Sequence, residues 1–292
     1  MLKKGIMLLI LSLSFQDQIR GAFFHELALV SAYAKGYAIA AEAEGLGSIF
    51  KNPAGLVSLS HTRVMSTASS YFNGAMNSAS FSVGIPLTPH VKMAVSLPIK
   101  HVDSIPKTSD VNGKGVLTGY FDELETSGIV SFAALLDYTL SIGINVEYLW
   151  HRIDDKTGSG VSVDLGIQGA YQEWRWGLSM ENAGNTAIQW TTGYRDRLPR
   201  RIHAGISRHV FEGVTVSGDS SWKEQGLDSI HLGTRIKLSP SFFIQAGLHN
   251  AMKTKRFSIG TQLILERWEL SYAFSQHEQL GIIHKIGMDI HY

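Results

Sequence analysis

The chain has 292 residues, and 26 Lys and Arg against 25 Asp and Glu give it a formal net charge of +1. This near-balance argues against a nucleic-acid partner, which favours a clear excess of basic residues. Charged residues make up only 17% of the chain, below the roughly 25% of soluble domains, and the absence of cysteine excludes disulfides and cysteine-based metal sites.

Residues 1–22 have the pattern of a signal peptide. Lys3 and Lys4 precede an apolar stretch, residues 5–15, of the length found in signal-peptide cores. The stretch is shorter than the roughly 20 apolar residues of a membrane-spanning helix. We therefore expect export, with cleavage after residues 12–14 or near residues 20–22. The alternative is an amphipathic or buried helix.

Residues 23–60 form a lead-in rich in small residues that ends in a turn motif. An asparagine before a proline suits a type I turn, because Asn accepts a local hydrogen bond and Pro fixes φ. Small side chains would let this segment lie inside a barrel, where protein or water must satisfy its backbone. We predict a short plug, with packing under the barrel as the alternative. The plug and turn residues are Phe50, Asn52, Pro53, Ala54, Gly55 and Leu56.

From residue 61 to the end, apolar and polar residues alternate, as in strands with two different faces. In residues 138–148 every second residue is apolar or aromatic, and polar or small residues stand between them. Such runs predict about 14 strands of the roughly 9–11 residues that a tilted membrane-spanning strand needs. The predicted fold is all-β, a transmembrane antiparallel β-barrel over residues 61–292. Asn145 should then face the lumen and accept arginine far better than Ile144.

A soluble β-sandwich also alternates, but two features favour the membrane barrel. Short and long connections alternate, for example residues 87–90 against 100–125. Aromatic residues gather near both strand ends, where bilayer interfaces favour them. An even number of strands would place both chain termini on the periplasmic side. The polar faces carry mixed charges, and the expected lumen-lining residues are Glu147, Asp164, Arg175, Arg235, Glu269 and Lys285.

The stretch AIAAEAEGLGSIFKNPAGL, residues 38–56, resembles the start of outer-membrane barrels of the long-chain fatty-acid transporter (FadL) superfamily. It is most similar to the PorV/PorQ-like branch, whose loop and strand-entry motifs resemble residues 182–185 and 198–205. The resemblance covers nearly the whole mature chain and implies a barrel of about 14 strands with an N-terminal segment inside. The short lead-in and modest loops do not match a full gating hatch.

Motifs of catalysis are weak in this chain. Residues 220–223 match Ser-x-x-Lys, but a strand splays the two side chains apart, whereas enzymes with this motif place it on a helix. Residues 154–155 fit a solvated turn, and calcium binding is the weaker alternative because EF-hand spacing is missing. Four strand histidines fit a lumen lining better than a metal site: His203, His231, His249 and His291. We expect no enzymatic activity, cofactor or metal.

Three functional hypotheses follow. As the resemblance implies, the barrel would pass small hydrophobic or amphipathic molecules, with movement of residues 50–56 opening the route. Alternatively, it is a PorV-like shuttle or accessory of type IX-like secretion whose loops bind a partner, or a purely structural barrel. The expected location is the cell outer membrane, and the expected partners are the lipid bilayer, the barrel-assembly machinery during biogenesis, and hydrophobic small molecules or a secretion partner.

Overall fold

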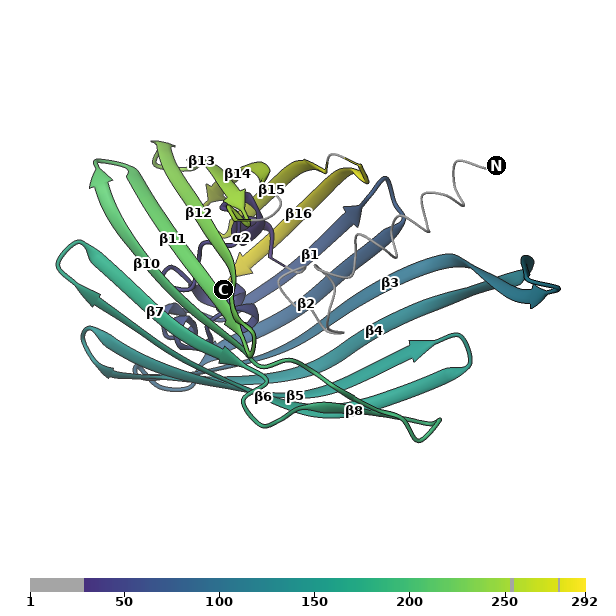
Figure 1. Cartoon of the computed structure of the whole chain (residues 1–292). Coiled ribbons are helices and arrows are strands. Elements are labelled where there is room, and N and C mark those ends of the chain that lie inside the picture. Colours follow the sequence, from purple (N-terminus) through teal and green to yellow (C-terminus); the bar gives the residue numbers. More distant parts are fainter. Residues whose placement is uncertain (1–28, 253–254, 278) are drawn as a thin grey trace.

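The computed structural model describes residues 29–252, 255–277 and 279–292, and within these residues the chain is a closed antiparallel β-barrel (Figure 1). Fourteen of its 16 strands form the wall, and β8 and β9 form a separate hairpin. Pairing of β5 with β6 closes the wall. The predicted fold, an antiparallel barrel of about 14 strands, is confirmed.

The first seven wall strands are β1 (Arg63–Tyr71), β2 (Met76–Pro86), β3 (Val91–Val111), β4 (Lys114–Asp137), β5 (Leu140–Ile153), β6 (Lys156–Tyr171) and β7 (Trp174–Glu181). The small hairpin is β8 (Ala187–Trp190) and β9 (Arg195–Arg197). The remaining wall strands are β10 (Arg201–Phe211), β11 (Val214–Lys223), β12 (Gly226–Ser239), β13 (Phe242–His249), β14 (Arg256–Leu265), β15 (Trp268–His277) and β16 (Gly281–His291).

The wall strands turn mostly apolar side chains outward and mostly small or polar ones inward, although a few large apolar residues such as Ile129 and Ile283 are buried inside. On β5, Ile144 is 37% exposed on the outer face, whereas its neighbour Asn145 is 1% exposed on the inner face. Such alternation follows from the two-residue period of a strand. The barrel therefore has an apolar outside and a largely polar inside.

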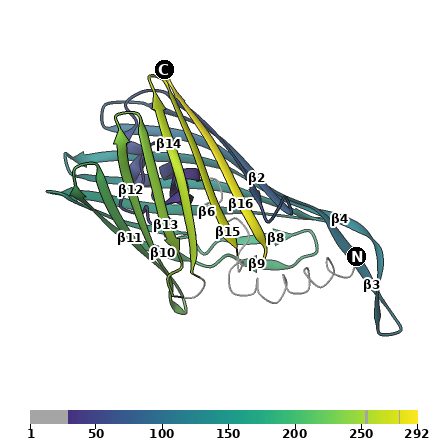
Figure 2. The same cartoon turned by 90° about the horizontal axis from the view of Figure 1, so that it is seen from above.

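The two ends of the barrel differ in their connections. We call the end with the connections at residues 87–90, 172–173 and 212–213 the short-turn end, and the other the loop end. β1 begins and β16 finishes at the short-turn end. Figure 2, which views the barrel from above, shows the β3–β4 pair reaching far beyond the other strands.

The long loop predicted over residues 100–125 is instead an extended hairpin, because β3 runs to Val111 and β4 starts at Lys114. Asn112 and Gly113 turn the chain with φ angles of 54° and 76°. Asn-Gly favours two-residue hairpin turns because both residues tolerate positive φ. The connection over residues 182–200 likewise contains the β8–β9 hairpin.

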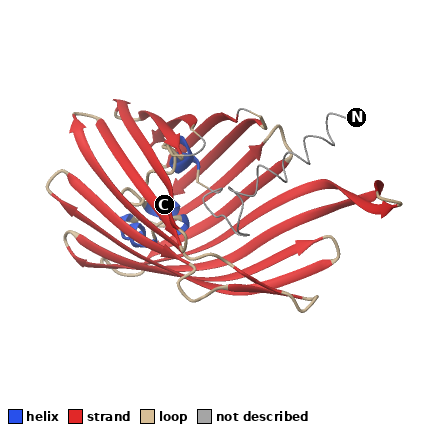
Figure 3. Cartoon of the chain, in the orientation of Figure 1, coloured by secondary structure: helices blue, strands red, loops and turns tan. Residues whose placement is uncertain are grey.

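Within the described residues, three short helices are found. They lie inside the barrel, as the blue elements in Figure 3 show. They are α2 (Val30–Ala34) and the 3₁₀ helices η3 (Gly45–Phe50) and η4 (Pro53–Ser58). In the described parts of the chain, none of the helices has the length and apolar character to cross a membrane. The main apolar core joins these helices to the inner faces of the wall.

Candidate functional site

Residues 29–60, here called the inner segment, follow the inner wall of the barrel. Helix α2 contacts β13 to β16, and η4 contacts β3 to β6, on another part of the wall. Nearly every residue from Leu29 to Leu56 is buried. The segment therefore occupies the lumen rather than extending away from the barrel.

The inner segment rests directly on glycines of the wall. A Cβ atom at Gly177 would lie 1.9 Å from the carbonyl oxygen of Ala40, and one at Gly247 would lie 2.0 Å from the backbone nitrogen of Gly36. Only a residue without a side chain permits such close backbone approach. We call this row the glycine belt: Gly143, Gly166, Gly177, Gly233, Gly247 and Gly260.

The turn motif is anchored by Asn52, which is fully buried. Its Oδ1 accepts a hydrogen bond from the Ala54 N–H at 3.2 Å, which caps η4, and Pro53 starts the helix. Its Nδ2 donates to the carbonyl of Ala40 at 2.9 Å and to that of Ile167 on β6 at 3.1 Å. One side chain thus ties two parts of the inner segment to the wall.

The neighbouring turn residues complete this packing. A Cβ at Gly55 would lie 1.9 Å from the Ala43 carbonyl oxygen, so the position has no room for a side chain. Phe50 and Leu56 are buried in the main apolar core, and Ala54 is fully buried. The motif therefore holds the segment together as well as turning the chain.

Charged side chains of the wall also hold the inner segment. On β11, Asp219 Oδ2 accepts hydrogen bonds from the N–H groups of Ile39, at 2.9 Å, and Ala40, at 2.7 Å. Such charge-assisted bonds are stronger than bonds between neutral groups. Asp219 thus accepts hydrogen bonds from two backbone N–H groups that lie outside any helix or strand.

A second anchor involves Lys51 and two wall residues. Lys51 Nζ lies 3.0 Å from Nδ1 of His203, and Nε2 of His203 lies 3.0 Å from Glu181 Oε1. Because an ammonium group only donates, Nδ1 of His203 accepts and Nε2 donates to the carboxylate. This chain of contacts connects Lys51, which follows η3, to β10 and β7.

Within the inner segment, Lys35 and Glu42 form a buried ion pair of 2.7 Å. Burial disfavours the charged form of Glu42, but the Lys35 ammonium, with hydrogen bonds from Lys35 and Ser207, outweighs it and lowers the pKa of Glu42 below its usual value of 4.5. The adjacent acidic residue, Glu44, pairs with Arg175 on β7. Both pairs help to fix the segment beside the wall.

Beneath the inner segment, at the short-turn end, lies a cavity of about 390 Å³. Three predicted lumen residues line it: Arg175, Arg235 and Glu269. Arg63 and Asp289 also line it and pair with each other at 3.4 Å. Opposite charges therefore surround this cavity.

The other predicted lumen residues lie elsewhere in the barrel, so the six do not form one site. Glu147 is buried, and Asp164 accepts a hydrogen bond from the backbone N–H of Asn182 at 3.0 Å. The Lys285 ammonium lies over the rings of Tyr33, at 4.7 Å, and Tyr71, at 5.0 Å. This cation–π contact joins β16, α2 and β1.

Sequence reasoning did not identify the anchors Lys51, Glu181 and Asp219. Their contacts join residues that are distant in the sequence. Asp219 accepts from Ile39 and Ala40, and Glu181 reaches Lys51 only through His203. The Ser-x-x-Lys match has an ordinary structural role. Ser220 Oγ donates to the Ala204 carbonyl, and Lys223 pairs with Asp228 at 2.8 Å.

A scan of protein-family models finds no match to the chain, and a search of curated proteins finds none either. Solved structures do match. The toluene transporter TbuX of Ralstonia pickettii is 13% identical, with 92% of this chain and 100% of that chain covered and a TM-score of 0.69. The monoaromatic hydrocarbon channel CymD is 12% identical, with 93% and 99% covered and a TM-score of 0.68.

A FadL homologue of Pseudomonas aeruginosa is 8% identical, with 90% of this chain and 98% of that chain covered and a TM-score of 0.60. At these identities the likeness is one of fold. The chain therefore has the barrel fold found in FadL-type hydrocarbon transporters, as the resemblance implied, while placement in the PorV/PorQ-like branch stays a prediction.

Proposed function

We propose that this protein is an outer-membrane channel for small hydrophobic or amphipathic molecules, closed at rest by its inner segment. The observation that carries the proposal is the seating of residues 29–60 on the glycine belt, inside a closed barrel with an apolar outer face. A wall whose glycines fit one segment of the same chain suits a segment that closes the channel and moves aside to open it.

The outer face supports a location in a lipid bilayer. Apolar side chains such as Ile144, Val146 and Leu165 are exposed there on neighbouring strands. A closed barrel leaves no unpaired strand edge, so its backbone polar groups are satisfied without water. The short-turn end, where β16 finishes, would face the periplasm, so the C-terminus would lie on that side. The proposed signal peptide, residues 1–22, lies outside the described residues.

The interior suggests a route through the barrel. From the loop end, a molecule would first meet the apolar core around Tyr71 and Met76, and then Phe50 and Leu56 of the inner segment. Beyond the segment it would enter the charged cavity at the short-turn end. Movement of residues 50–56 would open a way from the apolar core to this cavity. A polar group on the ligand could then be solvated as it leaves.

Uptake by cells that produce the protein tests this proposal. Radiolabelled toluene, an amphipathic fatty acid and a sugar are supplied separately, with cells that lack the protein as the control. We expect faster uptake of toluene or of the fatty acid, and unchanged uptake of the sugar. Equal uptake with and without the protein for both hydrophobic probes would contradict the proposal.

The β3–β4 hairpin favours a second candidate function, the binding of a secretion partner. It projects beyond the rim of the barrel (Figure 1). Its exposed apolar side chains include Val111, Leu117 and Tyr120. Removing residues 106–120 should leave uptake unchanged if the hairpin serves a partner. Loss of uptake would assign the hairpin to the passage instead.

A further inference from the structure

A row of directly opposed residues crosses four wall strands near the loop end of the barrel and continues onto the β8–β9 hairpin. Lys100 on β3 pairs in register with Glu125 on β4, and Glu125 pairs with His151 on β5. His151 in turn pairs with Gly158 on β6, which pairs with Trp190 of the β8–β9 hairpin. Because directly opposed residues share a face of the sheet, this row lies on the inner wall.

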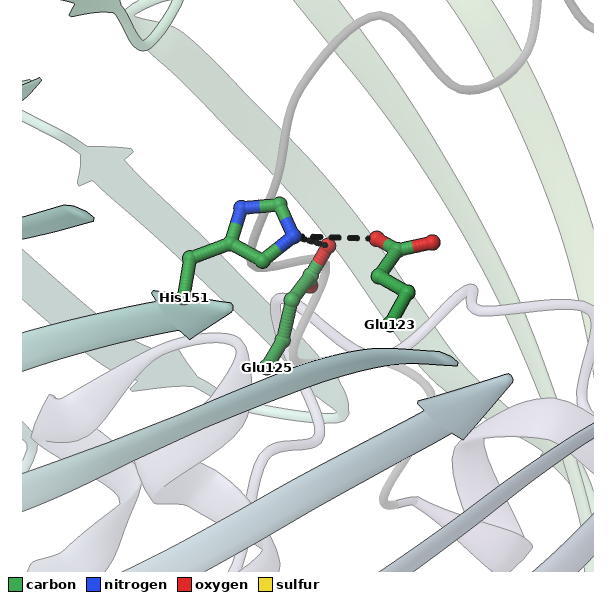
Figure 4. Close-up of side chains that lie close together, drawn as sticks. All are labelled: Glu123, Glu125 and His151. Atoms are coloured by element: carbon green, nitrogen blue, oxygen red, sulfur yellow. Dashed lines mark hydrogen bonds and ion pairs between the residues drawn. The ribbon is translucent and has the colours of Figure 1, made fainter. Parts of the chain in front are cut away.

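Two glutamates and one histidine converge in this row. Glu123 lies two residues before Glu125 on the same face of β4. His151 Nε2 lies 3.1 Å from Glu123 Oε1 and 3.6 Å from Glu125 Oε1 (Figure 4). One oxygen or nitrogen from each of the three residues lies within 4.8 Å of the others. A single small ion could therefore contact all three.

The charges of the cluster favour a cation. The Lys100 ammonium lies 2.5 Å from Glu125 and 3.3 Å from Glu123, so one lysine faces two carboxylates. The side chains of Glu125 and His151 are only 5% and 6% exposed. Buried carboxylates require a compensating positive charge, and a lysine supplies it from a flexible stem that can also move away.

We propose that Glu123, Glu125 and His151 form a binding site for a divalent transition-metal ion, with Lys100 as the tethered cation that the ion displaces. Two carboxylates and an imidazole suit Zn²⁺, and water can complete its coordination. The three ligands stand on hydrogen-bonded neighbouring strands, so the site is held by the wall and not by a loop. It is independent of the proposed transport function.

The β8–β9 hairpin covers the site from one side. A Cβ at Gly158 would lie 2.6 Å from a side-chain carbon of Ile188 and 2.9 Å from the Trp190 ring, so this glycine gives the hairpin its place. The His151 and Trp190 ring centroids are 5.0 Å apart. The indole therefore packs beside the imidazole that would bind the ion.

Zinc titration of the purified barrel, followed by calorimetry, tests the proposal. We expect one Zn²⁺ ion per chain. In His151→Ala the affinity for Zn²⁺ should fall by about tenfold or more, because loss of even a residue that only orients a metal ligand typically has an effect of that size. The matched control is His90→Ala, which removes an exposed histidine in the turn between β2 and β3. Zinc binding should be unchanged in that variant.

The variant Lys100→Met separates a metal site from a purely structural ion-pair network. Without the competing ammonium, Zn²⁺ should bind about tenfold tighter or more, because two close carboxylates lose their permanent counter-charge. Heat-dependent mobility in mild detergent gels shows whether each variant is folded. Weaker binding in folded Lys100→Met, or equal affinity in the folded wild type and His151→Ala, would overturn the proposal.

Discussion

The two faces of strand β5 differ in how specific their residues must be. Its outer face carries Ile142, Ile144 and Val146, which are 37–47% exposed. Its inner face carries Gly143, where a Cβ would lie 2.3 Å from the Pro53 carbonyl carbon, and Asn145, which contacts the inner segment. Any apolar residue can serve at a position on the outer face, whereas positions on the inner face require one particular residue.

This difference separates two kinds of failure. A polar substitution on the outer face should weaken the whole barrel, because it changes what the wall presents to lipid. A change on the inner face should release the inner segment and leave the hydrogen-bonded wall intact. The following predictions test this separation, from the largest expected effect to the smallest.

The largest effect is expected on the outer face. Arginine at Ile144, near the middle of the alternating stretch of residues 138–148, should lower the free energy of unfolding by about 2–4 kcal/mol. Arginine at Tyr148, on the same face but nearer the loop end, should lower it by only about 0–1 kcal/mol. Urea unfolding in lipid vesicles measures both variants. Equal losses would place the bilayer elsewhere on the strand.

The inner face of the same strand corrects an expectation from the sequence. Asn145 donates to the Ile49 carbonyl at 2.8 Å and accepts from Ser131 Oγ at 2.7 Å, and it is only 1% exposed. Arginine there has no open lumen to enter and would displace the inner segment. Asn145→Arg should therefore not be mild, although alternation correctly placed the residue inside.

Loss of the Asn52 side chain should be the next largest effect. Asn52→Ala removes two hydrogen bonds to backbone carbonyls and the cap of η4, which should lower the free energy of unfolding by about 1–3 kcal/mol. Asn77→Ala is the control, since its side chain is exposed and donates one long hydrogen bond, of 3.3 Å, to the Gly74 carbonyl. The same loss in both variants would show that the Asn52 contacts do not matter.

The glycine belt can be tested by adding one methyl group. At Gly177 this group would lie 1.9 Å from the Ala40 carbonyl oxygen, whereas at Gly128 it would meet nothing within 4 Å. Overpacking should destabilise Gly177→Ala by about 1–3 kcal/mol and loosen its inner segment, whereas Gly128→Ala should be unaffected. The chain has no cysteine, so the labelling rate of an introduced Ala41→Cys reports the change. Equal rates in both backgrounds would contradict the seating.

The smallest effect concerns acid. Because the pKa of Glu42 is lowered in the folded state, its pairing with Lys35 stabilises the protein fully above the usual pKa of 4.5, and this contribution disappears as the pH falls through the lower folded value. Unfolding free energies of wild type and Glu42→Gln should therefore differ at neutral pH and converge in strong acid. A difference that persists there would exclude this ion pair as the cause.

The sequence predicted the wall well because alternation is local. Residues 138–148 showed their two faces without knowledge of their neighbours, and repetition of this pattern implied a closed barrel. The β3–β4 hairpin was missed as strand although Asn112-Gly113 is a strong hairpin signal.

The interior was harder to predict because its contacts join distant residues. Asp219 is bonded to Ile39 and Ala40, which lie 180 and 179 residues away in the sequence. A periodic pattern of residues cannot reveal such a long-range contact. The belt glycines looked like ordinary strand residues until the inner segment was placed against them. Small residues in 38–47 did indicate a slim segment, but not the path that it follows.

The central claim is that the inner segment closes the lumen, and conductance across a planar bilayer tests it most directly. Residues 38–55 are replaced by a flexible Gly-Ser linker, and heat-dependent gel mobility verifies that the barrel is folded. The account predicts a clear rise in single-channel conductance over the full-length protein, because the lumen is then open from the loop end to the short-turn cavity. Unchanged conductance in the folded variant would contradict closure by this segment.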